Sequence, residues 1–315
     1  MNKIQRVRSV LRGETPDRVP ASFWFHFPKE QAHGKASVQA HLDYYRQTDL
    51  DFLKIMNEHP YRVDEQITNP ADWRKIRPAP LSSDFFQDQL DEIKMITDEL
   101  GGECLTVTTL FNPFSEGNHA ADHLVTEHLK ADPVSVNLGL ATIAESLAEF
   151  ACACLEAGAD GIYYSAQGGE ADRFEESEFL NYIKPHDLTV LSAIQDQSDF
   201  NILHICRDNV RLHHYADYPG NVVNWAANAP HNIPLNAGKN LFKRLILGGL
   251  DNRGVIVDGP PHQIKYAVHE VINDFGMDRL ILGADCTLPT EISLDHVRAV
   301  VEAAASYDPG QNAIR

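Results

Sequence analysis

The sequence predicts an α/β protein folded as a (β/α)8 TIM barrel. Eight short apolar segments, rich in β-branched and aromatic residues, alternate with stretches of helical periodicity. The 315 residues leave room for one barrel, which typically takes about 250 residues or more. No G-x-G-x-x-G loop follows the first apolar segment, where an open doubly wound sheet would normally carry one. We therefore predict a single barrel domain, residues 1–315, with an N-terminal helical extension.

The N-terminal extension is the helix predicted over residues 2–12, where apolar residues recur at helical spacing and Gly13 ends the pattern. Strands are predicted at the apolar runs 19–27, 51–56, 104–110, 161–165, 201–206, 221–226, 245–249 and 279–282. Helices are predicted at 38–48, 85–100, 138–157, 176–196, 210–218, 235–242, 261–275 and 293–304. Residues 57–80 are expected to be irregular because four prolines interrupt them.

Composition favours a soluble cytoplasmic protein and does not exclude an anionic small substrate. Lys and Arg total 27 against 45 Asp and Glu, and the net charge of −18 repels nucleic-acid backbones and anionic membranes. Five scattered cysteines, an odd number, argue against a secreted disulfide framework and favour a reducing compartment. The N-terminus has no apolar signal core, and no stretch approaches the roughly 18 apolar residues of a spanning helix. We expect no nucleic-acid or membrane partner.

A histidine and a cysteine two residues apart are the strongest chemical signal. His204 and Cys206 lie in the predicted strand 201–206, whose two-residue period points both side chains the same way. Cys286 follows a later predicted strand and is the best third ligand. One imidazole and two thiolates suit zinc, whereas magnesium and calcium prefer oxygen. The alternative is that both cysteines are inert core thiols and the histidine a core residue.

Other polar and aromatic residues also fall at the carboxyl ends of predicted strands, where the loops of such barrels carry function. Glu170 follows Gly168-Gly169 and is predicted to be a catalytic base, a metal ligand or a substrate contact, the alternative being a solvated loop carboxylate. Substrate contacts are predicted at Phe25, His26, Asn112, Tyr164, Gln167, Asn224, Trp225 and Asp285. The aromatic residues among them could instead belong to the core.

Segments at both ends of the chain resemble the uroporphyrinogen decarboxylase superfamily. R-G-E-T-P-D-R-V-P at 12–20 resembles the entry to the family's first strand, and G-G-L-D at 248–251 and L-G-A-D-C at 282–286 resemble its last strand ends. The resemblance implies a (β/α)8 barrel. His204, Cys206 and Cys286 match the His-x-Cys and distant Cys of its corrinoid-linked methyltransferases, except that Arg207 stands where relatives often have glycine. That match implies Zn²⁺, methylcobalamin as co-substrate and a thiol acceptor, and allows a corrinoid protein partner and a homodimer.

The metal-free decarboxylases of the same superfamily match less well. They bind the carboxylates of a tetrapyrrole with an arginine-rich segment after strand 1 and contact its pyrroles with an aspartate after strand 3. Here residues 26–30 read H-F-P-K-E, and Asn112 and Asn224 stand at the corresponding strand ends. An amide supplies no negative charge to stabilise a protonated pyrrole. The expected function is zinc-dependent methyl transfer to a thiol, with porphyrinogen decarboxylation and a non-catalytic ligand-binding barrel as alternatives.

Overall fold

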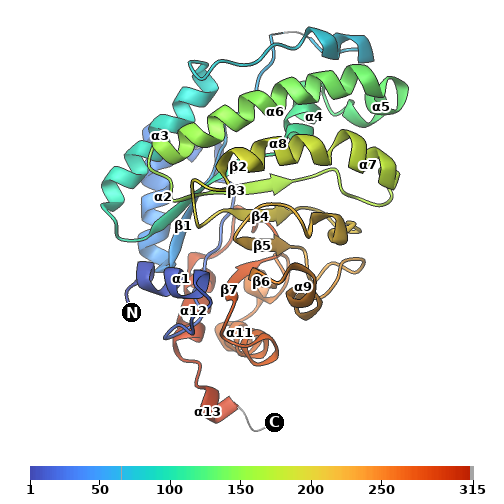
Figure 1. The fold of residues 1–315 in the computed structure, drawn as a ribbon. Coiled ribbons are helices and arrows are strands. Elements are labelled where there is room, and N and C mark those ends of the chain that lie inside the picture. Colours follow the sequence, from blue (N-terminus) through green and yellow to red (C-terminus); the bar gives the residue numbers. More distant parts are fainter. Residues whose placement is uncertain (65, 313–315) are drawn as a thin grey trace.

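The computed structural model describes residues 1–64 and 66–312 and contains a sheet of seven parallel strands in the order β1 to β7, curled into a barrel wall (Figure 1). Each strand coincides with a predicted one to within a few residues. The strands are β1 (Phe52–Ile55), β2 (Leu105–Phe111), β3 (Gly161–Ala166), β4 (Ile202–Ile205), β5 (Val222–Trp225), β6 (Leu245–Leu250) and β7 (Leu280–Ala284). The predicted barrel fold is confirmed.

The segment predicted as the first strand, residues 19–27, occupies the eighth position between β7 and β1 without forming a regular strand. Ala21 makes one parallel bridge to Leu282, and the Asp51 backbone N–H donates to the Ala21 carbonyl at 3.0 Å. Pro20 has no N–H to donate, and the Ala21 N–H goes to the Asp51 carboxylate at 2.8 Å instead of a strand carbonyl. The prediction of a regular strand was therefore wrong, because a side chain replaces part of the ladder.

Helices surround the barrel wall (Figure 1). The main ones are α1 (Lys3–Leu11), α2 (Gly34–Thr48), α3 (Asp84–Leu100), α6 (Pro133–Glu156), α9 (Leu235–Phe242), α11 (Pro261–Phe275) and α12 (Leu294–Ala305). The helical region predicted at 176–196 is divided into α7 (Glu176–Tyr182) and α8 (Lys184–Ile194). The short elements are η1 (Lys29–Gln31), η2 (Pro70–Lys75), α4 (Pro113–Ala120), α5 (Val125–Ala131), η3 (Leu212–Tyr215), α10 (Val255–Asp258) and α13 (Pro309–Asn312). α4 and α5 lie in an insertion between β2 and α6 that sequence periodicity did not reveal.

Helix α6 is the one described helix that is long and apolar enough to cross a membrane by length and composition. The expectation that no stretch would pass this test was therefore wrong. Its most apolar window is 56% buried against the rest of the protein. Gly139 lets the helix approach Trp73 of η2, since a Cβ there would lie 2.6 Å from the indole. These contacts are those of a packed core helix, and apolar composition follows from that burial.

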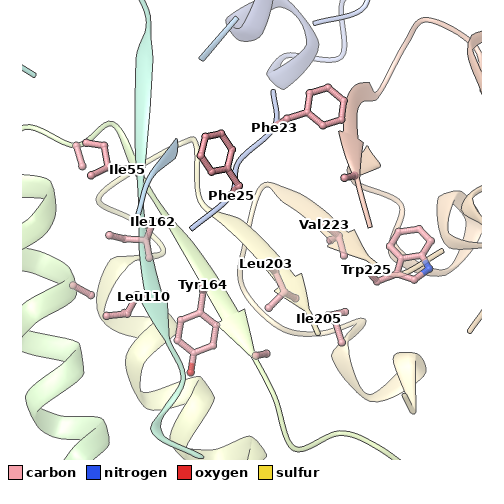
Figure 2. Packing of buried hydrophobic residues seen from close by; sticks show 14 of the residues in the cluster. Phe23, Phe25, Ile55, Leu110, Ile162, Tyr164, Leu203, Ile205, Val223 and Trp225 are labelled. Atoms are coloured by element: carbon pink, nitrogen blue, oxygen red, sulfur yellow. The ribbon is translucent and has the colours of Figure 1, made fainter. Parts of the chain in front are cut away.

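The two faces of the strands belong to two separate buried clusters. Along β4, Ile202 packs with Val7 and Val10 of α1 in one cluster, at the amino ends of the strands. Leu203 and Ile205 point to the other face and pack under the surrounding helices, together with Tyr164 and the other residues labelled in Figure 2. Because strand side chains alternate, every second residue of a strand faces the barrel interior.

Candidate metal centre and its cavity

His204, Cys206 and Cys286 come together at the carboxyl end of the barrel. Their ligand atoms lie within 4.8 Å of one another, and the Cys286 Sγ lies 3.6 Å from the His204 Nε2. Two ligands bound tetrahedrally to one zinc at ~2.0 Å (nitrogen) and ~2.3 Å (sulfur) are about 3.5 Å apart. The spacing and the soft donor set therefore fit a zinc ion.

Asn224, on the neighbouring strand β5, fixes how His204 is presented. Its amide Nδ2 donates to the carbonyls of Leu247 at 2.9 Å and Ala284 at 3.1 Å, so its Oδ1 is the acceptor that faces His204. The His204 Nδ1 lies 2.6 Å from that oxygen and must donate its proton there. The Nε2 facing Cys286 is then left with a lone pair, which is the form that binds a metal.

The two cysteines differ in acidity. The Cys286 thiol has a pKa well below its usual range, because it accepts a hydrogen bond from Cys206 and lies beside His204. The pKa of Cys206 is raised well above its usual value by the same hydrogen bond and by burial. The lowered pKa favours the thiolate form of Cys286, and thiolate is the ligand form of cysteine.

A cavity of about 220 Å³ opens above these three residues. Pockets that enclose drug-sized ligands have volumes of roughly 300–1,000 Å³. This cavity is smaller, so only a molecule smaller than a typical drug fits in it. Its wall combines cationic, aromatic and sulfur-containing side chains. Besides the three metal-site residues it is lined by His26, Lys54, Met56, Thr109, Phe111, Tyr163, Ser165, Gln167, Arg207 and Thr287.

Lys54 of β1 is a buried cation in this wall. Its side chain is 3% exposed, and its ammonium lies 4.2 Å from the centre of the Tyr163 ring and 3.1 Å from the Met56 Sδ. Among the residues that the structure describes, none places a carboxylate within 4.0 Å of this ammonium. Burial lowers the pKa of Lys54 from 10.5 to about 7. Binding of an anion beside this buried ammonium would offset the cost of burying its charge.

Strand alternation decides which of the predicted substrate residues reach the cavity. His26 and Gln167 line it, and Asn224 lies behind His204. Phe25, Tyr164 and Trp225 point away from it, and we correct these three predictions. Phe25 packs against Tyr44 with ring centres 5.0 Å apart, Tyr164 donates to Asp187 at 2.8 Å, and the Trp225 indole donates to a backbone carbonyl at 2.9 Å. Their neighbours in sequence, one residue away, face the interior.

Two further predicted residues, Asn112 and Asp285, are held in local hydrogen bonds outside the cavity wall. Asn112 is fully buried and caps α4 by accepting the Ser115 N–H at 3.0 Å. Asp285 accepts the backbone N–H groups of Ala227 at 3.1 Å and Asn228 at 3.0 Å, and burial raises its pKa to about 6. Both side chains hold backbone N–H groups of the protein itself, whereas the sequence predicted that they contact the substrate.

Glu170, the predicted catalytic residue, also lies outside the cavity wall. One carboxylate oxygen lies 3.3 Å from an Arg173 nitrogen, and the other is buried without a hydrogen-bond partner among the described residues. Its charge contributes to raising the pKa of Cys206, and Glu170 is not among the residues that line the cavity. A role in the chemistry stays a prediction.

Several cavity residues were not predicted, although the two-residue period of the strands could have found them. Lys54 and Met56 of the β1 region and Tyr163 and Ser165 of β3 alternate with residues of the outer cluster, as His204 does. Arg207 was identified from the sequence only as a residue that stands where relatives in the resembled family often have glycine. Its backbone has φ of 86°, a left-handed conformation that glycine adopts without strain, so the arginine is kept at a conformational cost of ~1–2 kcal/mol.

Comparison with known proteins identifies relatives that cover nearly the whole chain. Residues 49–307 match the sequence model of the family described as Uroporphyrinogen decarboxylase (URO-D). Methylcobamide:CoM methyltransferase MtbA from Methanosarcina mazei is 22% identical, over 96% of this chain and 97% of that protein. A methyltransferase structure from Methanosarcina mazei superposes with a TM-score of 0.74 at 18% identity, covering 96% and 98% of the two chains. A B12-independent methionine synthase from Shewanella sp. W3-18-1 gives 0.64 at 13% identity, covering 91% and 97%.

Proposed function

The chain belongs to the uroporphyrinogen decarboxylase family, and we propose that it is a methyltransferase that moves a methyl group from a corrinoid to a small thiol. The observation that carries the proposal is the convergence of His204, Cys206 and Cys286 beside a small cavity. The relatives named as methylcobamide:CoM methyltransferases support a corrinoid as the donor and a thiol as the acceptor.

In this proposal the three residues hold a zinc ion, and Asn224 keeps His204 in the tautomer that binds it. Zinc when bound would lower the pKa of a coordinated thiol from about 8.5, so that the acceptor is a thiolate at neutral pH. In the overall reaction a carbon–sulfur bond forms and the cobalt–carbon bond breaks. The electron pair of the broken bond stays on cobalt, and the thiol proton goes to solvent. The walls of the cavity exclude water from the sulfur and orient it.

Lys54 supports a thiol that carries an anionic group. The residue faces the cavity, is buried, and has no carboxylate within ion-pair distance among the described residues. The charges of Cys286 and Glu58 offset the effect of burial on the pKa of Lys54 only in part, and a further anion in the cavity would favour the protonated lysine. Arg207, in the same wall, adds a second cation. We therefore propose an acceptor with a carboxylate, sulfonate or phosphate near its thiol.

The test combines metal analysis with turnover. Protein purified without added metal is expected to contain one zinc per chain at the cysteine site, and Cys286→Ser is expected to lose it. Consumption of methylcobalamin, followed by its visible absorbance with a panel of neutral and anionic thiols, reports the reaction. Absence of zinc from the cysteine site and of methyl transfer with every thiol would overturn the proposal. Carbon dioxide release from uroporphyrinogen with a chelator present would instead support a decarboxylase.

A further inference from the structure

Outside the cysteine site, a second group of potential metal ligands lies beside the loop that follows β1. His33, His59 and Glu92 place one ligand atom each within 4.8 Å of one another. They come from three elements: His33 precedes α2, His59 follows β1, and Glu92 lies in α3. We propose that these three residues form a second zinc site, which ties the loop after β1 to helices α2 and α3.

The carboxylate of Glu92 is the centre of this group. Its residue is 1% exposed, and its Oε1 lies 3.0 Å from the His59 Nε2. The described residues place no lysine or arginine within 4.0 Å of it, so a buried negative charge has no full cationic partner there. A divalent cation would supply that charge, which the hydrogen bonds to the carboxylate do not.

The surroundings of Glu92 and His59 are those of oriented metal ligands. The Ser37 hydroxyl donates to the Glu92 Oε2 at 2.9 Å, and the Gly34 N–H donates to the Oε1, which fixes the carboxylate. The His59 Nε2 lies 3.0 Å from the Glu92 Oε1 and donates its proton there, because a carboxylate only accepts. A metal ion shared by the two groups would take the place of that proton. The Asp88 Oδ2 lies 3.9 Å from the Nδ1, beyond hydrogen-bond distance.

Distances and access also fit one shared ion. Two ligands at ~2.0–2.1 Å from a tetrahedral zinc are about 3.3 Å apart, close to the 3.0 Å between His59 and Glu92. The His33 and His59 rings have centres 4.8 Å apart, and His33 is exposed, so its side chain is free to turn toward the ion. All three line a cavity of about 690 Å³ that is open to solvent. Two imidazoles and one carboxylate are a zinc donor set.

The site would act on the central cavity through the loop it fixes. Glu58, next to His59, accepts a hydrogen bond from the His26 Nδ1 at 2.7 Å, and His26 lines the cavity above the cysteines. A metal at His59 therefore restrains the segment that holds His26. This role is structural, and it does not depend on whether the cysteine site carries zinc.

The test removes the cysteine site first. In the full chain, Cys206→Ser/Cys286→Ser is expected to bind one Zn²⁺ after dialysis against a chelator and titration with the metal alone. Adding His33→Ala or Glu92→Gln to this parent is expected to weaken the binding at least ~10-fold. His33 is exposed, so His33→Ala should leave the fold intact. Adding His262→Ala, at an exposed residue of α11, is the matched control and should change nothing.

Hydrogen exchange gives a second measurement. Zn²⁺ is expected to slow exchange in residues 57–64 of the cysteine-free parent, and to have no effect there with His33→Ala added. Absence of Zn²⁺ binding to the parent would overturn the proposal. So would unchanged affinity in both His33→Ala and Glu92→Gln, or loss of binding on His213→Ala, because His213 belongs to the separate group formed with Glu176 and His214.

Discussion

Replacing Asn224 by alanine tests the proposed metal site through a residue that does not itself bind the metal. The side-chain Oδ1 accepts hydrogen bonds from the His204 Nδ1 at 2.6 Å and from the Tyr163 hydroxyl at 3.1 Å. It also donates to the carbonyls of Leu247 and Ala284. Asn224→Ala frees the imidazole to adopt the other tautomer, and loss of such a partner typically weakens metal binding 10–100-fold, or ~1.4–2.7 kcal/mol.

The assay is zinc competition against a chromophoric chelator at neutral pH, together with denaturant unfolding of the metal-free protein. Asn224→Ala leaves two buried carbonyls without their donor, so unfolding free energy should also fall by ~1–3 kcal/mol. Asn201→Ala is the matched control. Asn201 is a buried asparagine at the other end of β4, and it bonds to the Ile162 N–H at 3.0 Å and the Ile194 carbonyl at 3.1 Å.

The control should lose comparable stability and keep its zinc affinity. Wild-type zinc affinity in a folded Asn224→Ala protein would refute the argument that the asparagine selects the histidine tautomer. Equal loss of zinc affinity in Asn201→Ala would also refute it, since the effect would then follow from stability alone.

Three further predictions concern charge and packing around the barrel. Burial lowers the pKa of Lys54 from 10.5 to about 7. Between these two pH values the unfolded chain binds more protons at Lys54 than the folded protein does. The free energy of unfolding therefore rises with pH, by at most ~1.4 kcal/mol per pH unit. Lys54→Met should flatten that rise in denaturant unfolding at about pH 7 to 9, and an equal slope in both proteins would contradict the burial argument. Gly238→Ala places a Cβ 2.0 Å from the Trp225 ring and should lower stability by ~1–3 kcal/mol with zinc content unchanged; zinc loss at an unchanged Tm would argue against a packing role for Trp225. Tyr164→Phe removes the hydrogen bond to Asp187 and should lower the free energy of unfolding by ~0.5–1.5 kcal/mol. Methylcobalamin consumption should not slow. Slower turnover at unchanged stability would instead indicate that Tyr164 contacts the substrate.

The metal-binding motif illustrates what local sequence determines. His204 and Cys206 share a face of one strand because side chains alternate, and a short apolar run bounded by polar residues identifies that strand. The alternation of such runs with helical patterns was enough to predict the barrel, and seven of the eight strands lie where they were expected. These features depend on residues close together in the chain.

The wall of the cavity depended on information that neighbouring residues do not contain. Lys54 and Cys286 meet because the sheet curls until β1 and the end of β7 border one cavity. Whether Tyr163 or Tyr164 faces inward is decided by the register of β3 against β2 and β4, and a shift of one residue reverses it. Aromatic and polar residue types at strand ends therefore predicted the right end of the barrel, but misplaced Phe25, Tyr164 and Trp225.

The amino-acid sequence by itself determined the fold class, because periodicity is a local property. It offered His204, Cys206 and Cys286 as candidate metal ligands through their residue types and through the resemblance to corrinoid-linked methyltransferases. Only the tertiary structure decided that Asn224 orients His204, that Lys54 is buried with no carboxylate within 4.0 Å among the described residues, and that His33, His59 and Glu92 converge. Hydrogen-bond partners and burial arise from contacts between segments tens of residues apart. Those contacts exist only once the barrel has closed.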